Sequence, residues 1–340
     1  MSISMFNTRT MLKALEQVFP ATTFLLNTFF QGVEKSESKY VDIDIYKGKK
    51  KLAPFVRSTQ QGKFVERIGF TTKTFEPPYI KEKMVTTSDE ILNNRAMGGN
   101  IYLGKTPQQR AAEQLMKDME YLRELIIRRE EWMASQVLET GIIPIVSDGY
   151  EAEIDFGMDA THIIATGDIT VWDDANATPL SDLLDWKRLI QLDSGLVPRI
   201  VVMGYDAWDA FIAHANVQTL LDNRRIALGQ IEPRELPEGV EYQGDVHNLS
   251  IYTYGETYVS DAEATTYYVP AKKIFMGCTN ARTARHYGAI RDLESGFTPV
   301  QYFPKSWVEK DPSSRILLVQ SSPLVAMHQP DAFLCAAVLT

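Results

Sequence analysis

Cysteine is scarce in this chain of 340 residues, which limits how the fold can be held together. The two cysteines are Cys278, in the run KIFMGCT, and Cys335, in the run AFLCAAVL. Both lie in apolar, strand-like sequence, which predicts buried free thiols rather than a disulfide framework. The pattern excludes a disulfide-stapled secreted domain and favours a reducing, cytoplasm-like compartment.

Long apolar runs and an excess of positive charge are also missing. No apolar run reaches the roughly 18 residues needed to span a membrane, and no secretory signal opens the chain, so no membrane partner is expected. The formal net charge is −9. This net charge argues against an indiscriminate nucleic-acid binder, because neutralising phosphates requires clustered Lys and Arg without an acidic excess.

Signals of catalysis and of metal binding are weak. The five histidines are far apart in the sequence and none has a nearby Cys or His at metal-ligand spacing; they are His162, His214, His247, His286 and His328. No G-x-S-x-G nucleophile motif occurs. The sequence therefore predicts no catalytic residue, no cofactor and no metal ion, and the protein is not expected to be an enzyme.

One phosphate-binding pattern keeps an enzymatic alternative open. Gly99–Thr106 matches G-x-x-x-x-G-K-[ST] and precedes a predicted helix, so a nucleotide-binding enzyme of the P-loop kind would use this segment. Its context argues against that use. No buried strand leads into the segment, Pro107 removes a backbone amide at the helix start, and three bulky residues occupy the loop, namely Ile101, Tyr102 and Leu103.

A helix of unusual length is the strongest structural signal. Thr106 can cap its start, Pro107 suits the first helical position, and Gly141 suits a left-handed stop. Apolar residues recur between these ends at three- and four-residue steps, as in Leu115, Met119, Leu122, Ile126, Met133 and Val137. A helix over residues 107–140 would be about 50 Å long and would span the molecule.

A basic hairpin is predicted before this helix. Residues 40–46 alternate apolar and polar side chains, and residues 66–76 form a returning strand with charged, Gly- and Pro-containing sequence between them. Residues 47–83 contain eight Lys, two Arg and three Glu, a surplus of seven positive charges, so the rest of the chain carries sixteen negative ones. A long polar hairpin has little core of its own and is expected to reach a partner.

The remaining chain predicts an α+β mixture without repeats. Residues 1–37 are expected to form an apolar arm that lies across other structure, and residues 88–100 a short helix closed by glycines. Short strands are expected at residues 142–146, 150–158, 162–166 and 168–172, followed by a helix over 179–194 that stops at Gly195. Further strands and helices alternate from Pro198 to the C-terminus.

An ordered series of short motifs resembles the lambda-type major capsid protein E family of tailed phages. The series comprises FEPPYIK at 75–81, LDNRR at 221–225, GCTNAR at 277–282, YFPKSW at 302–307, QSSPL at 320–324 and the pair Pro330-Asp331. No single motif is diagnostic, but their order is kept along essentially the whole chain.

The resemblance implies the major capsid fold that tailed phages share with herpesviruses. That fold has an N-terminal arm, an extended loop, a peripheral domain with a long spine helix and an axial domain. The arm would be residues 1–37 and the extended loop hairpin 38–87. The peripheral domain would take 88–190 and 300–340, with the spine helix at 107–140, and the axial domain 191–299.

The resemblance also implies a structural function. The protein would be the major head protein of a bacteriophage, self-assembling into hexamers and pentamers of an icosahedral shell around packaged double-stranded DNA, with procapsid maturation from a round to an angular shell. The alternatives are the nucleotide-binding enzyme described above and a scaffold or tail component. Because the chain opens directly on the arm, a separate scaffolding protein is expected, together with a portal and room for a decoration protein.

Contacts between subunits are expected at two places. The arm would bury four apolar side chains on an adjacent subunit, those of Leu25, Leu26, Phe29 and Phe30. The hairpin would present its cations to a neighbour's acidic peripheral domain, using Lys47, Lys49, Lys50, Lys51, Arg57 and Lys63. The acidic body would contact DNA only weakly, and the protein is expected in the virion capsid after assembly in the host bacterial cytoplasm.

Overall fold

The computed structural model describes residue 11 and residues 23–47, 52–53, 55–57, 61, 70–87, 107–147, 150–222, 229–236, 239–260, 263–296, 299–311 and 313–340. The phosphate-binding pattern at 99–106 and the short helix expected at 88–100 lie outside these residues. So does most of the expected arm before residue 23.

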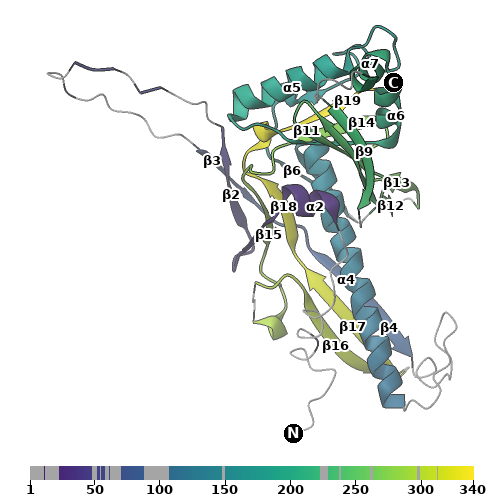
Figure 1. Cartoon of the computed structure of the whole chain (residues 1–340). Helices are drawn as coiled ribbons and strands as arrows, with labels where there is room; N and C mark the ends of the chain where they lie inside the picture. The colour runs from purple at the N-terminus through teal and green to yellow at the C-terminus, as the bar shows by residue number, and fades with distance from the viewer. Residues whose placement is uncertain are drawn as a thin grey trace.

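The long helix predicted from the sequence is confirmed as α4, Pro107–Thr140, and it runs along most of the length of the molecule (Figure 1). At 1.5 Å per residue its 34 residues extend about 50 Å. The helix stops at Gly141, whose φ is 71° and whose N–H donates to the carbonyl of Val137, 3.0 Å away. A left-handed glycine therefore ends the helix where the sequence predicts.

Two separate hydrophobic cores lie along α4. The first half of the helix packs on strand β17, Ser313–Ser321, in a small core that also contains Met11. The second half enters the main core of the molecule, where the large sheet lies. The helix side chains are Leu115, Met119, Leu122 and Ile126 in the small core and Met133, Ala134, Val137 and Leu138 in the main core. One helix thus connects two packing units.

The main core is built on a seven-stranded mixed sheet with strand order β7-β19-β14-β8-β11-β10-β9. Its strands are β7 Ile163–Ile164, β8 Ile200–Met203, β9 Gly229–Leu236, β10 Val240–Val246, β11 Leu249–Tyr254, β14 Lys273–Gly277 and β19 Phe333–Ala337. Three adjacent strands, β19, β14 and β8, are buried almost throughout, because structure covers both of their faces. Both cysteines are free and buried in this core, as predicted.

Three helices lie beside this sheet, at the end of the molecule where α4 finishes (Figure 1). They are α5 Pro179–Ser194, α6 Tyr205–Ala213 and α7 Ala215–Asp222. Helix α5 ends at Gly195, which adopts a φ of 69° as the sequence predicts. The domain boundary expected between residues 190 and 191 falls inside this continuous helix.

The strand expected at residues 168–172 is absent, and that prediction is wrong. Residues 166–176 form a series of turns instead. Asp168 accepts a hydrogen bond from the N–H of Ala165, and Asp174 accepts one from the N–H of Asn176. Aspartate side chains that bond to nearby backbone amides compete with sheet pairing, and here that competition outweighs the β-branched composition.

Smaller sheets surround the body. Strand β17 lies between β16, Phe303–Lys310, and β4, Ile80–Thr87. Another sheet joins β1, Gly32–Lys35, to β15, Thr283–Tyr287, and β18, Pro323–Met327. Two-stranded ribbons complete the fold, with β5 Ile142–Ser147 paired to β6 Tyr150–Asp155, and β12 Thr257–Val259 paired to β13 Thr265–Tyr267.

The predicted hairpin is present as β2, Val41–Tyr46, paired with β3, Phe70–Phe75, and it projects sideways from the body (Figure 1). The root of the hairpin is buried more deeply in the main core than the sequence predicts. Val41, Ile43 and Ile45 are at most 4% exposed and belong to the main core, while Asp42 and Asp44 on the other face accept hydrogen bonds from threonines of β3. The root is therefore fixed to the body.

The apolar arm residues differ from the expectation. Leu25, Leu26, Phe29 and Phe30 lie in or directly after α2, Phe24–Phe29, which packs against α4, and each is at most 1% exposed within its own chain. Phe29 and Phe30 both contact the ring of Phe333, on β19. These four side chains have no surface left for an adjacent subunit, so their assignment as inter-subunit contacts is corrected.

Candidate inter-subunit surfaces

The hairpin carries exposed cationic and apolar side chains away from the body. Lys47 and Arg57 are exposed, and Leu52 and Phe55 are 96% and 103% exposed. Four other predicted contact residues lie outside the described residues, namely Lys49, Lys50, Lys51 and Lys63. Leu52 and Phe55 therefore leave apolar area that burial by a partner would remove from water.

An acidic surface complements the hairpin. Residues 150–186 contain nine Asp and Glu and no Lys or Arg. Eight of these carboxylates are exposed, at Glu151, Glu153, Asp155, Asp159, Asp168, Asp173, Asp174 and Asp185. We call residues 150–186 the acidic segment. The run of carboxylates is visible in the sequence, although the acidic body was predicted from the net charge alone.

The acidic segment meets the root of its own hairpin. Lys73 Nζ on β3 donates to the backbone carbonyl of Asp155, 2.8 Å away, and lies 3.4 Å from the Asp155 carboxylate. The pKa of Asp159 is lowered, first by hydrogen bonds from Thr161 and further by the nearby charge of Lys47.

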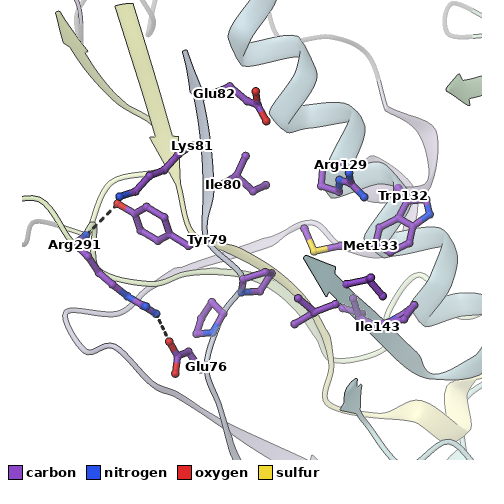
Figure 2. A pocket seen from close by; sticks show the side chains of 15 residues that line it. Glu76, Tyr79, Ile80, Lys81, Glu82, Arg129, Trp132, Met133, Ile143 and Arg291 are labelled. Atoms are coloured by element: carbon purple, nitrogen blue, oxygen red, sulfur yellow. Dashed lines mark hydrogen bonds and ion pairs between the residues drawn. The ribbon is translucent and has the colours of Figure 1, made fainter. Parts of the chain in front are cut away.

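A cleft of about 650 Å³ opens between the start of β4, the middle of α4 and β5 (Figure 2). Its apolar lining comes from Ile80, Trp132, Met133, Ile143 and Val146. Figure 2 shows Tyr79 and Arg291 at one side of it and Arg129 and Trp132 at the other.

Ion pairs hold one rim of the cleft. Arg291 lies 2.6 Å from Glu76, which also contacts Lys39 at 2.9 Å. The hydrogen bond from Lys39 is the main cause that lowers the pKa of the Glu76 carboxyl, and Arg291 adds to it. The backbone N–H of Arg291 donates to the hydroxyl of Tyr79, whose ring the guanidinium overlies at 5.5 Å. Apolar lining with a charged rim suits the burial of a partner's side chain.

Two buried carboxylates of α4 lie where the two cores meet. Glu131 accepts hydrogen bonds from the backbone amides of Leu25 and Leu26, at the start of α2, and from the hydroxyl of Tyr254. Glu130 accepts one from the hydroxyl of Tyr287 at 3.0 Å, and burial raises its pKa to about 7. The spacing of apolar residues in the sequence gave no sign that Glu130 and Glu131 accept these buried hydrogen bonds.

Other kinds of site find little support in the described part of the chain. Within it, no three His, Cys, Asp or Glu side chains are grouped as metal ligands. No described helix is long and apolar enough to cross a membrane.

The subunit is an elongated α+β protein with one long helix, two cores and a hairpin beside an acidic surface. Comparisons with known proteins show its class. The family model for phage major capsid protein E matches residues 7–338, and the chain belongs to that family. As a member of a structural capsid family it is a component of the virion shell and not an enzyme.

Individual relatives agree along nearly their whole length. The major capsid protein of enterobacteria phage P21 is 26% identical over 343 residues, covering 99% of this chain and all of that protein. The major capsid protein of Escherichia phage lambda is 25% identical over 338 residues, covering 97% and 98%.

Solved structures share the fold. A prophage capsid protein of Escherichia coli CFT073 superposes with a TM-score of 0.76 at 21% identity, covering 98% of this chain and 99% of that one. The capsid of Ralstonia phage GP4 gives a TM-score of 0.52 at 11% identity, covering 95% and 93%. The family identity predicted from the ordered motifs is confirmed, and none of these comparisons supports a nucleotide-binding enzyme.

Proposed function

We propose that this subunit forms the hexamers and pentamers of an icosahedral head around double-stranded DNA, through repeated head-to-tail contacts. The supporting observation is the separation of charge within one chain. The hairpin region 47–83 has a surplus of seven positive charges, and the acidic segment has nine carboxylates without Lys or Arg. Two different surfaces that attract each other generate a ring when the rotation between subunits closes.

The outer hairpin of one subunit would lie on the acidic segment of the next. Lys47 and Arg57 are the described cations of this contact, and Leu52 and Phe55 add apolar area that a neighbour would cover. Each contact is weak alone because exposed charges are screened by salt. Ringed contacts strengthen one another through effective concentration, so a shell is durable while single errors can dissociate.

The proposed domains follow the arrangement of arm, extended loop, peripheral domain and axial domain that the family resemblance implies. Residues 38–87 act as the extended loop, whose last strand β4 pairs with β17, and the peripheral domain holds α4, β16 and β17. We place the start of the axial domain at Gly195 rather than at residue 191, because α5 is continuous to Ser194. Helix α4 links both packing units, so bending of this helix would couple them during maturation from a round to an angular shell.

Other partners follow from the assembly proposed. Shell closure would involve a separate scaffolding protein and a portal, with assembly in the host cytoplasm, and a decoration protein would bind outside. The acidic charge of the chain would leave packaged DNA weakly bound and able to slide.

A charge-exchange experiment tests the head-to-tail contact. Lys47→Glu with Arg57→Glu reverses the hairpin, and Glu151→Lys with Glu153→Lys reverses the acidic segment. Each double variant should assemble poorly, and the four substitutions combined should restore assembly because attraction is re-established. Light scattering and negative-stain microscopy would measure the extent of shell assembly in each variant.

A control is Lys117→Glu, a charge reversal at an exposed position of α4, which should assemble normally. Normal shells from both double variants, or no recovery in the combined variant, would contradict the contact.

A further inference from the structure

Two histidines that are 42 positions apart in the sequence meet at the root of the hairpin. His286 lies on β15 opposite Leu324 of β18, and His328 directly follows β18, so their rings reach each other along the paired strands rather than across them. Their Nε2 atoms are 3.2 Å apart. His286 is 3% exposed, and His328 is partly buried.

Each of the other ring nitrogens faces an oxygen acceptor. His328 Nδ1 lies 3.0 Å from the backbone carbonyl of Asp44, which can only accept a hydrogen bond. His286 Nδ1 faces the carboxylate of Glu34 at 3.4 Å. When both Nδ1 atoms carry the hydrogen, both Nε2 atoms of the neutral rings hold lone pairs.

In that tautomer two lone pairs face each other across 3.2 Å and repel unless a positive charge lies between them. A proton shared by the two rings or a metal ion bound between them supplies that charge, and only the metal ion brings further ligands to the site.

We propose that His286 and His328 form a two-histidine site for a divalent transition-metal ion of the Zn²⁺ class. Zinc bonded tetrahedrally to two imidazoles at 2.0–2.1 Å separates the nitrogens by about 3.3 to 3.4 Å, close to the distance found. The Glu34 carboxylate and the Asp44 carbonyl then act as the outer partners that orient metal-bound imidazoles. With two protein ligands, water completes the coordination and the affinity is moderate.

The position gives the ion a structural consequence. Asp44 lies on β2, and the carbonyl of His328 accepts a hydrogen bond from the N–H of Tyr46 at the end of the same strand. Glu34 lies on β1, so the site joins β1, β2, β15 and β18; Figure 1 shows β15 and β18 beside β2. Metal binding would stiffen the root from which the hairpin projects.

Zinc titration of the chelator-treated, unassembled subunit by calorimetry tests the proposal. One Zn²⁺ should bind per chain, and His286→Gln or His328→Gln should weaken binding by at least tenfold. Glu34→Gln, at a carboxylate whose side chain is 63% exposed, should weaken it by about tenfold through loss of the outer partner. Glu37→Gln, at a nearby exposed carboxylate, is the matched control and should bind as wild type.

Cobalt provides a readout that needs no variant. Co²⁺ held tetrahedrally by the two imidazoles and water should absorb visible light more strongly than the octahedral hydrated ion. Absence of saturable Zn²⁺ uptake, a spectrum of hydrated cobalt alone, or unchanged affinity in both histidine variants would overturn the site.

Discussion

The carboxylate of Glu131, in the middle of α4, accepts a hydrogen bond from the backbone N–H of Leu25, 2.8 Å away at the start of α2. Its second oxygen accepts from the N–H of Leu26 at 3.1 Å. Thr23 precedes α2 without making a side-chain cap, so Glu131 satisfies amides that a local residue usually caps. Helix α2 is thereby attached to α4 by a buried carboxyl group.

Glu131→Ala should destabilise the subunit by about 3 kcal/mol or more, because it leaves two buried amides and the hydroxyl of Tyr254 without this acceptor. Urea unfolding of the unassembled subunit would measure the loss. Glu124→Ala on the same helix removes an exposed ion pair with Arg128 and should cost about 0.5 kcal/mol or less. Equal losses in the two variants would show that the buried cap is unimportant.

Glu130 should make stability depend on pH. Its pKa rises to about 7 in the folded protein, mainly through burial, and is near 4.5 when unfolded. The folded state then holds the proton more tightly, so this contribution is fully present below about pH 4.5 and is lost as pH rises through 7. The loss amounts to about 3 kcal/mol.

Glu130→Gln stays uncharged and still accepts from Tyr287, so its unfolding free energy should fall less than that of wild type between pH 5 and pH 8. Denaturant titrations at both pH values would compare them. Parallel pH profiles of the unfolding free energy in the two proteins would contradict the raised pKa of Glu130.

Gly141 should tolerate no side chain. Its φ is 71°, and a Cβ there would lie 2.5 Å from the Cβ of Met158. Gly141→Ala should therefore lower the melting temperature and cost about 2 kcal/mol, from left-handed strain and from the clash at the end of α4. Gly167→Ala is the matched control, since nothing lies within 4 Å of its added Cβ, and it should be nearly neutral. A neutral Gly141→Ala would mean that α4 can end in another way.

Assembly should weaken with salt if the hairpin contact is electrostatic. Arg57→Glu, at an exposed position, should slow assembly at low ionic strength, and the difference from wild type should shrink as salt rises. Time-resolved light scattering over a salt series would measure both rates. A defect that is constant across the series would instead indicate a packing role for this residue.

How far the sequence predicts the structure depends on whether the signals are local. Helix α4 was predicted with both ends because Pro107, Gly141 and the apolar stripe all lie within the segment itself. The hairpin was predicted from alternation and turn residues. The prediction of a strand at residues 168–172 is wrong because aspartate side chains bond to nearby backbone amides and turn the backbone.

The burial of the arm and the polar contacts depended on distant partners. Leu25 was expected to be covered by a neighbour, yet its covering helix and its cap, Glu131, come more than 100 positions later. His286 and His328 are 42 positions apart in the sequence, and their rings meet only in the folded chain. Neither relationship has a local pattern, so periodicity and spacing could not reveal it. The interface cations stay predictions, and four of them lie outside the described residues.

Deleting residues 49–62 and comparing the variant with the full chain by negative-stain microscopy and light scattering, alone and with a scaffolding protein, tests the role of the hairpin most directly. The full chain should form closed shells, or rings of five and six. The deleted chain should stay soluble with unchanged helical circular dichroism, because the root of β2 and β3 remains packed on the body, and should form no shells. Intact shells from the deleted chain would remove the hairpin from the assembly mechanism.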